Sequence, residues 1–161
     1  MKIRWGVLLV VVLMTFSCAQ EDASETANMA NSDRLTEEVW NGGNLDLLDD
    51  FIAEDYVRHN PASVDPPVVS GLDEMKEYIT SVRTTYPDFH VEVHHRLADG
   101  DLVAGSWTVT GTNTDVGIAI ENPGISISRY QDGKVAEEWV SWDTQSLTDQ
   151  LAVDSETDTE D

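Results

Sequence analysis

The chain has 161 residues, enough for one domain with a hydrophobic core, and its 31 acidic and 9 basic side chains give a formal net charge of −22 at pH 7. Such a surface repels the phosphates of nucleic acids and anionic lipid headgroups. The composition therefore argues against nucleic acid as a partner and against membrane contact through the folded surface.

Residues 1–17 have the composition of a secretory signal peptide, because Lys2 and Arg4 precede an almost wholly apolar run that is short for a membrane span. The only cysteine, Cys18, follows directly, and TFSC resembles a bacterial lipoprotein cleavage box with threonine in place of leucine. The resemblance implies cleavage before Cys18, lipid on its sulfur, and membrane anchoring at the bacterial cell envelope. Ordinary secretion, with cleavage after Ala19, is the alternative. Without the two basic residues of the signal, seven basic and 31 acidic side chains leave a net charge of −24.

Both ends of the remaining chain are acidic and poor in large apolar residues. Residues 18–32 are therefore expected to form a flexible tether between membrane and domain, and residues 151–161 a disordered acidic tail. Residues 33–150 carry the periodic apolar patterns of one compact domain.

Three helices are predicted in the first half of this domain: residues 33–41, 44–52 and 71–86. Their apolar residues recur at spacings of three and four. Asn44 can cap the second helix, Ser70 and Asp73 can form a capping box for the third, and Pro87 ends the third.

Strands are predicted at residues 56–60, 89–97, 102–110, 116–120, 125–130 and 135–142. After the third helix the apolar residues alternate with a period of two. Turns are expected at Asp99-Gly100, at Asn122-Pro123-Gly124 and between Gln131 and Lys134. Helices followed by an antiparallel meander indicate an α+β domain with the helices on one face of the sheet.

The last hairpin can form in two ways. A two-residue turn at Asp132-Gly133 would place Arg129 opposite Ala136, whereas a three-residue turn with a bulge would pair Arg129 with Val135. We favour the three-residue turn. It would place on one face a set that resembles a pocket wall: Arg129, Val135, Glu137, Trp139 and Asp143. The alternative is an ordinary sheet with a tryptophan-rich core.

Histidines at 90, 94 and 95 raise the question of a metal site. His94 and His95 are neighbours on a predicted strand, so they should point to opposite faces, and no cysteine or carboxylate cluster accompanies them. We therefore expect no metal. Nucleophile-elbow, phosphate-loop and HExxH patterns are also absent from the sequence.

Three segments in order, GLDEMKEYI, YPDFHVEVHHRLADGDLVAGSWTVTGTNT and ISISRYQDGKVAEEWVSWD, resemble the SnoaL-like polyketide cyclases of the nuclear transport factor 2 superfamily. The similarity extends over nearly the whole domain, from Leu35 to Leu151. It implies a cone-shaped α+β barrel, in which a strongly curved antiparallel sheet and about three N-terminal helices enclose a small-molecule pocket. Family members studied as enzymes close a polyketide ring by an intramolecular aldol reaction without a cofactor.

The resemblance also assigns residues. Asp143 matches the acid/base aspartate, His59 the pocket histidine after the second helix, and Arg129 the polar residue on the strand before the hairpin. Two departures leave the substrate class open: Asn113 stands where many relatives have histidine, and the stretch of residues 115–124 is short.

These assignments give a mechanistic hypothesis. Asp143, buried among Trp107 and Trp139, has a raised pKa and removes a proton beside a carbonyl group, while Arg129 or His59 stabilises the enolate. The alternative is a non-catalytic binder of a small apolar ligand, in which Asp143 only caps the helix that follows. A third interpretation is an interaction module that uses the outer sheet face, through which the resemblance implies that two copies pair.

Overall fold

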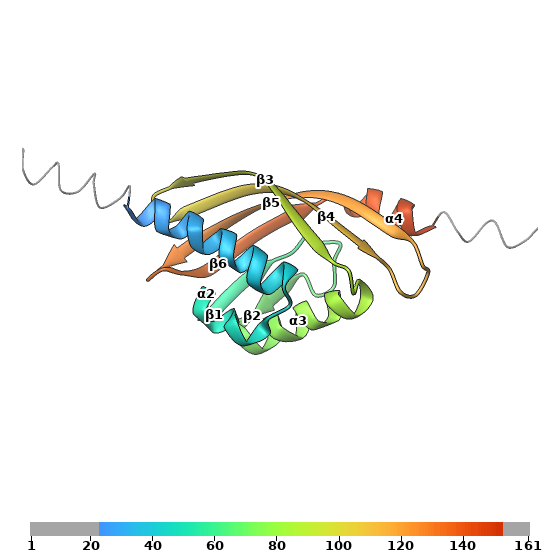
Figure 1. Ribbon diagram of the computed structural model, residues 1–161, viewed down its shortest axis with the longest axis horizontal. Helices are drawn as coiled ribbons and strands as arrows, with labels where there is room; N and C mark the ends of the chain where they lie inside the picture. The colour runs from blue at the N-terminus through green and yellow to red at the C-terminus, as the bar shows by residue number, and fades with distance from the viewer. Residues whose placement is uncertain (1–22, 153–161) are drawn as a thin grey trace, which may run out of the picture.

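The computed structural model describes residues 23–152, and Figure 1 shows them as a curved sheet with helices packed against one side. Six strands form the sheet in the order β2-β1-β6-β5-β4-β3. They are β1 (Ile52–His59), β2 (Val68–Ser70), β3 (His90–Asp99), β4 (Leu102–Thr112), β5 (Ala119–Gln131) and β6 (Lys134–Trp142). The α+β class is confirmed. Because β1 and β6 are parallel while the other pairs are antiparallel, the sheet is mixed rather than wholly antiparallel.

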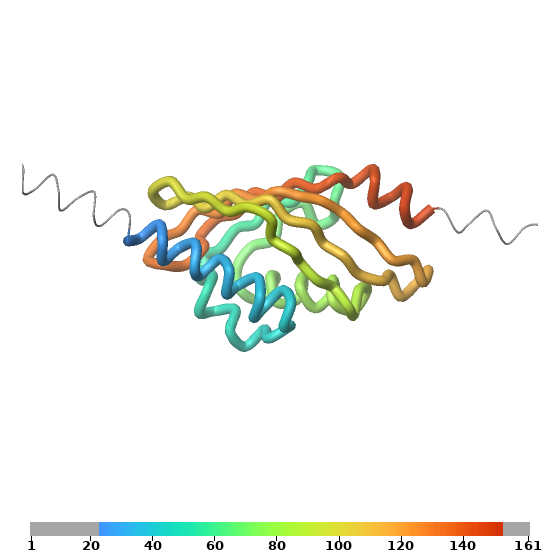
Figure 2. Tube along the Cα trace, turned by 45° about the horizontal axis from the view of Figure 1, so that its top comes forward, coloured from blue at the N-terminus to red at the C-terminus, as the bar shows by residue number. Residues whose placement is uncertain are grey.

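The N-terminal helix begins earlier than the sequence predicted. Residues 23–34 are helical and continue into the π-helix η1 (Leu35–Asn41), so the prediction of a flexible tether was wrong for residues 23–32. Tertiary contacts override the acidic composition there. The side chains of Asn28 and Ser32 are buried, and Glu25 Oε1 accepts the Gly100 N–H at 2.7 Å, beside the turn between β3 and β4 (Figure 2).

The second and third helices also differ from prediction in detail. The second is a 3₁₀ turn, η2 (Leu45–Leu47), followed by the short α2 (Leu48–Phe51), so that β1 already begins at Ile52. Helix α3 (Gly71–Thr85) matches the predicted range, but its capping differs. The Ser70 side chain makes no capping bond, and Glu74 rather than Asp73 accepts the Ser70 N–H, at 2.8 Å.

Strand β5 runs straight through Asn122-Pro123-Gly124, where the sequence predicted a turn. Proline is tolerated in a strand where its missing N–H needs no partner. Residues 119–123 of β5 pair with β4 alone, since pairing with β6 begins only at Gly124. The strand is thus an edge at Pro123.

The hairpin between β5 and β6 combines a two-residue turn with a bulge. Asp132 and Gly133 have φ of 53° and 79°, as in a type I′ turn. Beyond this turn, Tyr130 pairs with Val135 and the next pair is Arg129 with Glu137, so Ala136 is an extra residue in β6. The predicted three-residue turn and the Arg129–Val135 pair were therefore wrong. Arg129 and Glu137 do share a face, but the bulge sends Val135 to the opposite one.

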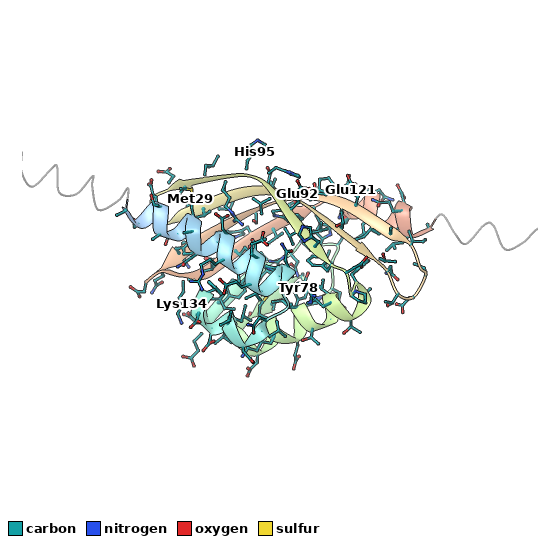
Figure 3. All side chains as sticks on the ribbon, viewed as in Figure 1. Met29, Tyr78, Glu92, His95, Glu121 and Lys134 are labelled. Carbon is teal, nitrogen blue, oxygen red and sulfur yellow. The ribbon has the colours of Figure 1, made fainter. Side chains whose placement is uncertain are left out.

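A second bulge, at His94 in β3, has the same effect. His94 contacts Thr108 and His95 contacts Ser106, which lie two residues apart on β4 and so face the same side. The two histidines consequently share the outer face, contrary to prediction, and Figure 3 shows His95 pointing away from the helices. The described residues contain no cluster of His, Cys, Asp and Glu that could hold a metal ion.

The hydrophobic core lies at the end of the sheet that carries the turn between β5 and β6. Its buried members come from η1, α2, α3, β1, β2 and the ends of β4, β5 and β6: Val39, Leu48, Phe51, Ile52, Tyr56, Val69, Met75, Ile79, Val103, Tyr130 and Val135. The C-terminal α4 (Thr144–Ala152) lies at the other end of the molecule (Figure 1). None of the described helices is long and apolar enough to span a membrane. Between the core and α4, the helices and the sheet are not packed together completely.

Candidate functional site

A cavity of about 170 Å³ lies between the inner face of the sheet and the helices η1 and α3. Most of its wall is apolar and aromatic, the usual lining of a ligand pocket. The apolar and aromatic lining residues are Leu35, Trp40, Tyr78, Val82, Tyr86, Phe89, Val91, Val93, Trp107, Val109, Ile120, Val140, Trp142 and Leu147. The polar ones are Ser32, Thr36, Arg58, Arg96, Asn122, Ser126, Ser128 and Glu138. In Figure 3, Tyr78 on α3 points toward the sheet.

The pocket contains one buried ion pair, between Arg58 on β1 and Glu138 on β6. Their residues pair directly in the parallel ladder, and Arg58 Nη1 donates to Glu138 Oε2 at 2.5 Å. Tyr56 Oη donates to the same oxygen at 2.7 Å, and Ser128 Oγ lies 3.4 Å from the other. The carboxylate of Glu138 is therefore held by three groups.

The ion pair controls the protonation of its neighbours. Burial and the negative charge of Glu138 raise the pKa of the Tyr56 hydroxyl well above its ordinary value. Burial, the largest single effect, would lower the pKa of Arg58, but the charge of Glu138 and the contributions of two neighbouring tyrosines together outweigh it, and the net shift is upward. Arg58 thus remains a cation and Tyr56 a neutral donor across the physiological range.

Aromatic rings surround the guanidinium of Arg58. Its Cζ lies 5.3 Å from the ring centre of Trp40 and 5.5 Å from that of Tyr78, within the range of cation–π attraction. Trp40 also contacts Tyr78 edge-on at 6.5 Å and Phe89 at 5.9 Å. These contacts fix one wall of the pocket.

Trp107 on β4 forms the opposite wall and lies over Gly124 of β5, its cross-strand partner. A β-carbon on Gly124 would overlap the Trp107 ring, coming within 2.5 Å of Cζ3 and 2.6 Å of Cζ2. Only glycine leaves room for the indole in this position. Its Nε1 is 3.4 Å from Ser126 Oγ, which fixes the orientation of the ring.

The second cation of the wall, Arg96 on β3, is also paired. Its Nε donates to Asp33 Oδ1 at 2.7 Å, and its Nη2 donates to Thr36 Oγ1 at 2.7 Å. A further contact joins Nη1 to Ser32 Oγ. Each charged side chain of the lining therefore has a partner of opposite charge.

Asn122 differs from the other polar groups of the pocket. It is 1% exposed, and its Oδ1 has no hydrogen-bond partner among the described residues. Buried side-chain oxygens are rarely left in this state.

Asp143 does not lie in this pocket. Its side chain is exposed, and its Oδ1 accepts the Ser146 N–H at 2.8 Å, which makes it the N-cap of α4. It borders only a surface depression formed with residues of α4. The expected burial of Asp143 among Trp107 and Trp139 was therefore wrong, because those rings lie on opposite faces of the sheet.

Four of the other predicted site residues lie on the outer face. Glu137 binds His59 Nε2 at 3.0 Å and Arg129 Nη2 at 3.2 Å, and the ring of His59 stacks on Trp139 at 5.7 Å. The hydrogen bond from His59, followed by that from Arg129, lowers the pKa of Glu137. The structure thus brings four of the predicted residues together, but on the face away from the cavity, while Val135 lies in the core. Trp107 alone of the predicted pocket residues lines it.

The sequence interpretation missed Arg58, Glu138 and Asn122. Arg58 directly precedes one predicted residue, His59, and Glu138 directly follows another, Glu137, so both lie on the opposite face from the residue that was predicted. One signal was available: Arg58 and Glu138 carry opposite charges on two strands, and each stands two residues from a large apolar residue, Tyr56 in one strand and Val140 in the other.

Comparisons with known proteins agree with this architecture. A family model described as SnoaL-like polyketide cyclase matches residues 30–151. IdmH, a candidate polyketide cyclase from Streptomyces antibioticus, is 26% identical with a TM-score of 0.66, and the match covers 77% of this chain and 97% of that one. A nuclear transport factor 2-like protein of unknown function from Burkholderia pseudomallei shares the fold, with a TM-score of 0.70, 18% identity, and coverage of 78% and 98%. No curated protein matches the chain.

Proposed function

This chain belongs to the SnoaL-like polyketide cyclase family, and from this membership we propose that it binds a small, largely apolar molecule in the pocket on the inner face of its sheet. The observation that carries the proposal is the aromatic cavity between the Trp40 and Trp107 walls. Apolar surface removed from water contributes about 25 cal/mol per Å², so a ring held between these walls gains most of its affinity from burial.

The groups in the pocket favour binding over proton transfer. A general base must be free to accept a proton from the ligand. The carboxylate in the pocket, Glu138, is held by an arginine and two hydroxyl-bearing side chains, while Asp143 is exposed and caps α4. A non-catalytic ligand carrier agrees with this arrangement.

Cofactor-independent cyclisation or isomerisation of a carbonyl compound, with Asp143 as acid and base, is the second candidate function. Family membership favours it, and so does the chain position of Asp143, between the pocket residues Trp142 and Leu147. An enolate formed in this pocket would face Arg58, because Arg129 and His59 lie on the outer face.

The proposed place of this function is the bacterial cell envelope, with lipid on Cys18 as the anchor. Cys18 and the signal segment lie outside the described residues. Pairing of two copies through the outer face is also proposed. A row across five strands, Leu97, Ala104, Ile127, Trp139 and His59, exposes 63% of Leu97, 42% of Ile127 and 40% of Trp139 there.

A matched pair of variants tests the pocket. Val140→Phe places a ring inside the cavity, whereas Ile125→Phe adds a ring on the outer face, where Ile125 is 56% exposed. We expect fluorine NMR to detect binding of para-fluorotoluene to the wild type and to Ile125→Phe, but not to Val140→Phe. Circular dichroism verifies that both variants fold. Equal binding by all three proteins would refute a ligand site at this cavity.

A further inference from the structure

We infer that the pocket takes a neutral, one-ring aromatic molecule that carries a hydroxyl group, and that Asn122 binds this hydroxyl. The inference rests on the proposed function and adds to it the size, the charge and the polar group of the ligand.

Asn122 supplies the polar group. It lies on the inner face of β5, opposite Val109, and it lines the cavity although only 1% of it is exposed. Since Oδ1 has no partner, the empty pocket leaves a desolvated acceptor unpaired. A ligand donor reaching this atom would remove that penalty.

The surroundings of Asn122 provide no substitute partner. Ser126, on the same face of the strand, is four residues away, or about 13 Å along an extended chain. Its Oγ already lies within hydrogen-bonding distance of the Trp107 indole nitrogen. A hydroxyl is also the group best suited to the amide, because it both donates and accepts and so fits either orientation of the oxygen and nitrogen.

The volume of the cavity sets the size of the ligand. A cavity of about 150 Å³ in another protein holds a single benzene ring. At about 170 Å³, this pocket has room for one substituted ring between Trp107 and the opposite wall, and not for the fused rings of a polycyclic polyketide.

The pairing of charges sets the charge of the ligand. Arg58 pairs with Glu138 and Arg96 with Asp33, so no cation of the pocket wall is left to bind an anion. An ionised carboxylate placed there would lose its hydration without a partner. A neutral molecule avoids this loss.

Five probes test the inference by calorimetry on the full chain: p-cresol, p-methylanisole, toluene, para-hydroxybenzoate and a hydroxyanthraquinone. We expect p-cresol to bind about tenfold more tightly than toluene or p-methylanisole, neither of which can donate to Asn122. The last two probes should not bind, the benzoate because of its charge and the anthraquinone because of its size.

Asn122→Leu is the matched variant, since leucine has a similar size and no polar atom. It should remove the preference for p-cresol over toluene while retaining toluene binding. It should also raise the free energy of unfolding of the empty protein, because the unpaired oxygen is gone. If the variant does not fold, the comparison of p-cresol with p-methylanisole on the wild type still decides.

The outcomes separate this inference from the proposed function. Equal affinity for p-cresol and toluene, or tight binding of the anthraquinone or the benzoate, would overturn the inference and leave the pocket in place. Failure of every probe to bind, in the wild type as in Val140→Phe, would overturn the proposed function as well.

Discussion

Gly124→Ala tests whether the Trp107 wall is fixed by the absence of a side chain opposite it. The added methyl group would come within 2.5 Å of ring carbon Cζ3, whereas ordinary contacts begin near 3.4 Å, so the ring must move by about 1 Å. Gly124 is not among the glycines with positive φ, so alanine is compatible with the backbone. The whole cost therefore comes from the indole.

Two effects of opposite sign set the magnitude. Overpacking against a fixed ring costs about 1–3 kcal/mol, while replacing a strand glycine by alanine at a compatible position gains about 0.4–1 kcal/mol through the unfolded state. Gly124→Ala should thus lower the free energy of unfolding in the wild type and raise it slightly in a Trp107→Leu background. Urea unfolding of the four proteins gives the coupling energy, which we expect to exceed about 1 kcal/mol.

The displacement of the Trp107 ring should also affect ligand binding. A ring pushed away from β5 enters the cavity, so Gly124→Ala should weaken toluene binding. A destabilisation of equal size in both backgrounds would refute the steric argument, because it would show that the cost arises in the strand and not at Trp107.

Four further predictions concern separate parts of the chain. Asp143→Asn should retain wild-type stability, because asparagine caps a helix as well as aspartate does, whereas Asp143→Ala should lose about 1 kcal/mol in urea unfolding. Loss of turnover of an enolisable substrate in the asparagine variant would establish the acid/base role of Asp143, and full activity would exclude it. Glu138→Gln leaves a buried arginine unpaired and should cost about 3–5 kcal/mol of unfolding free energy, and an unchanged midpoint would show that the ion pair is solvated. The backbone N–H and then the hydroxyl of Thr112 lower the pKa of Asp88. The contribution of Asp88 to stability is therefore complete above about pH 4 and is lost as the pH falls through its folded-state pKa. The difference in unfolding free energy between the wild type and Asp88→Asn should shrink in acid, and a difference that grows there would contradict the assignment. Cells fed an alkyne fatty acid should label the wild type but not Cys18→Ser, and equal labelling of both would refute lipidation.

The fold could be predicted from the sequence because the apolar periods are long and regular. Helix α3 and strands β3, β4 and β6 were placed nearly as observed, and the resemblance added the curved sheet and its pocket. The N-terminal extent of the first helix could not be predicted, because Asn28 and Ser32 are buried by contacts with distant parts of the chain. The helical stretch around them looks, by composition, like a disordered one.

The face of each residue was harder to predict than its strand. A single extra residue reverses every side chain beyond it. Val93 and Leu97 alternate in phase in the sequence, but the bulge at His94 leaves Val93 on the inner face and Leu97 on the outer one. The bulge at Ala136 likewise separates Val135 from Glu137. Neither position carries a glycine or proline to indicate it. An error in face explains why Glu137 was chosen and its neighbour Glu138 was not, whereas His59 was assigned from the resemblance and its neighbour Arg58 faces the pocket.

The parallel pairing of β1 with β6 has a consequence for how the protein folds. Arg58 and Glu138 are separated by 80 positions in the chain, and the strands between them complete the sheet. Contacts over such distances in sequence close slowly, because the entropy of a long loop is lost before the contact compensates for it. During synthesis the edge of β1 that pairs with β6 has no partner until β6 has been made, so Arg58 remains solvated until Glu138 is available. The pocket is therefore among the last parts of the molecule to form.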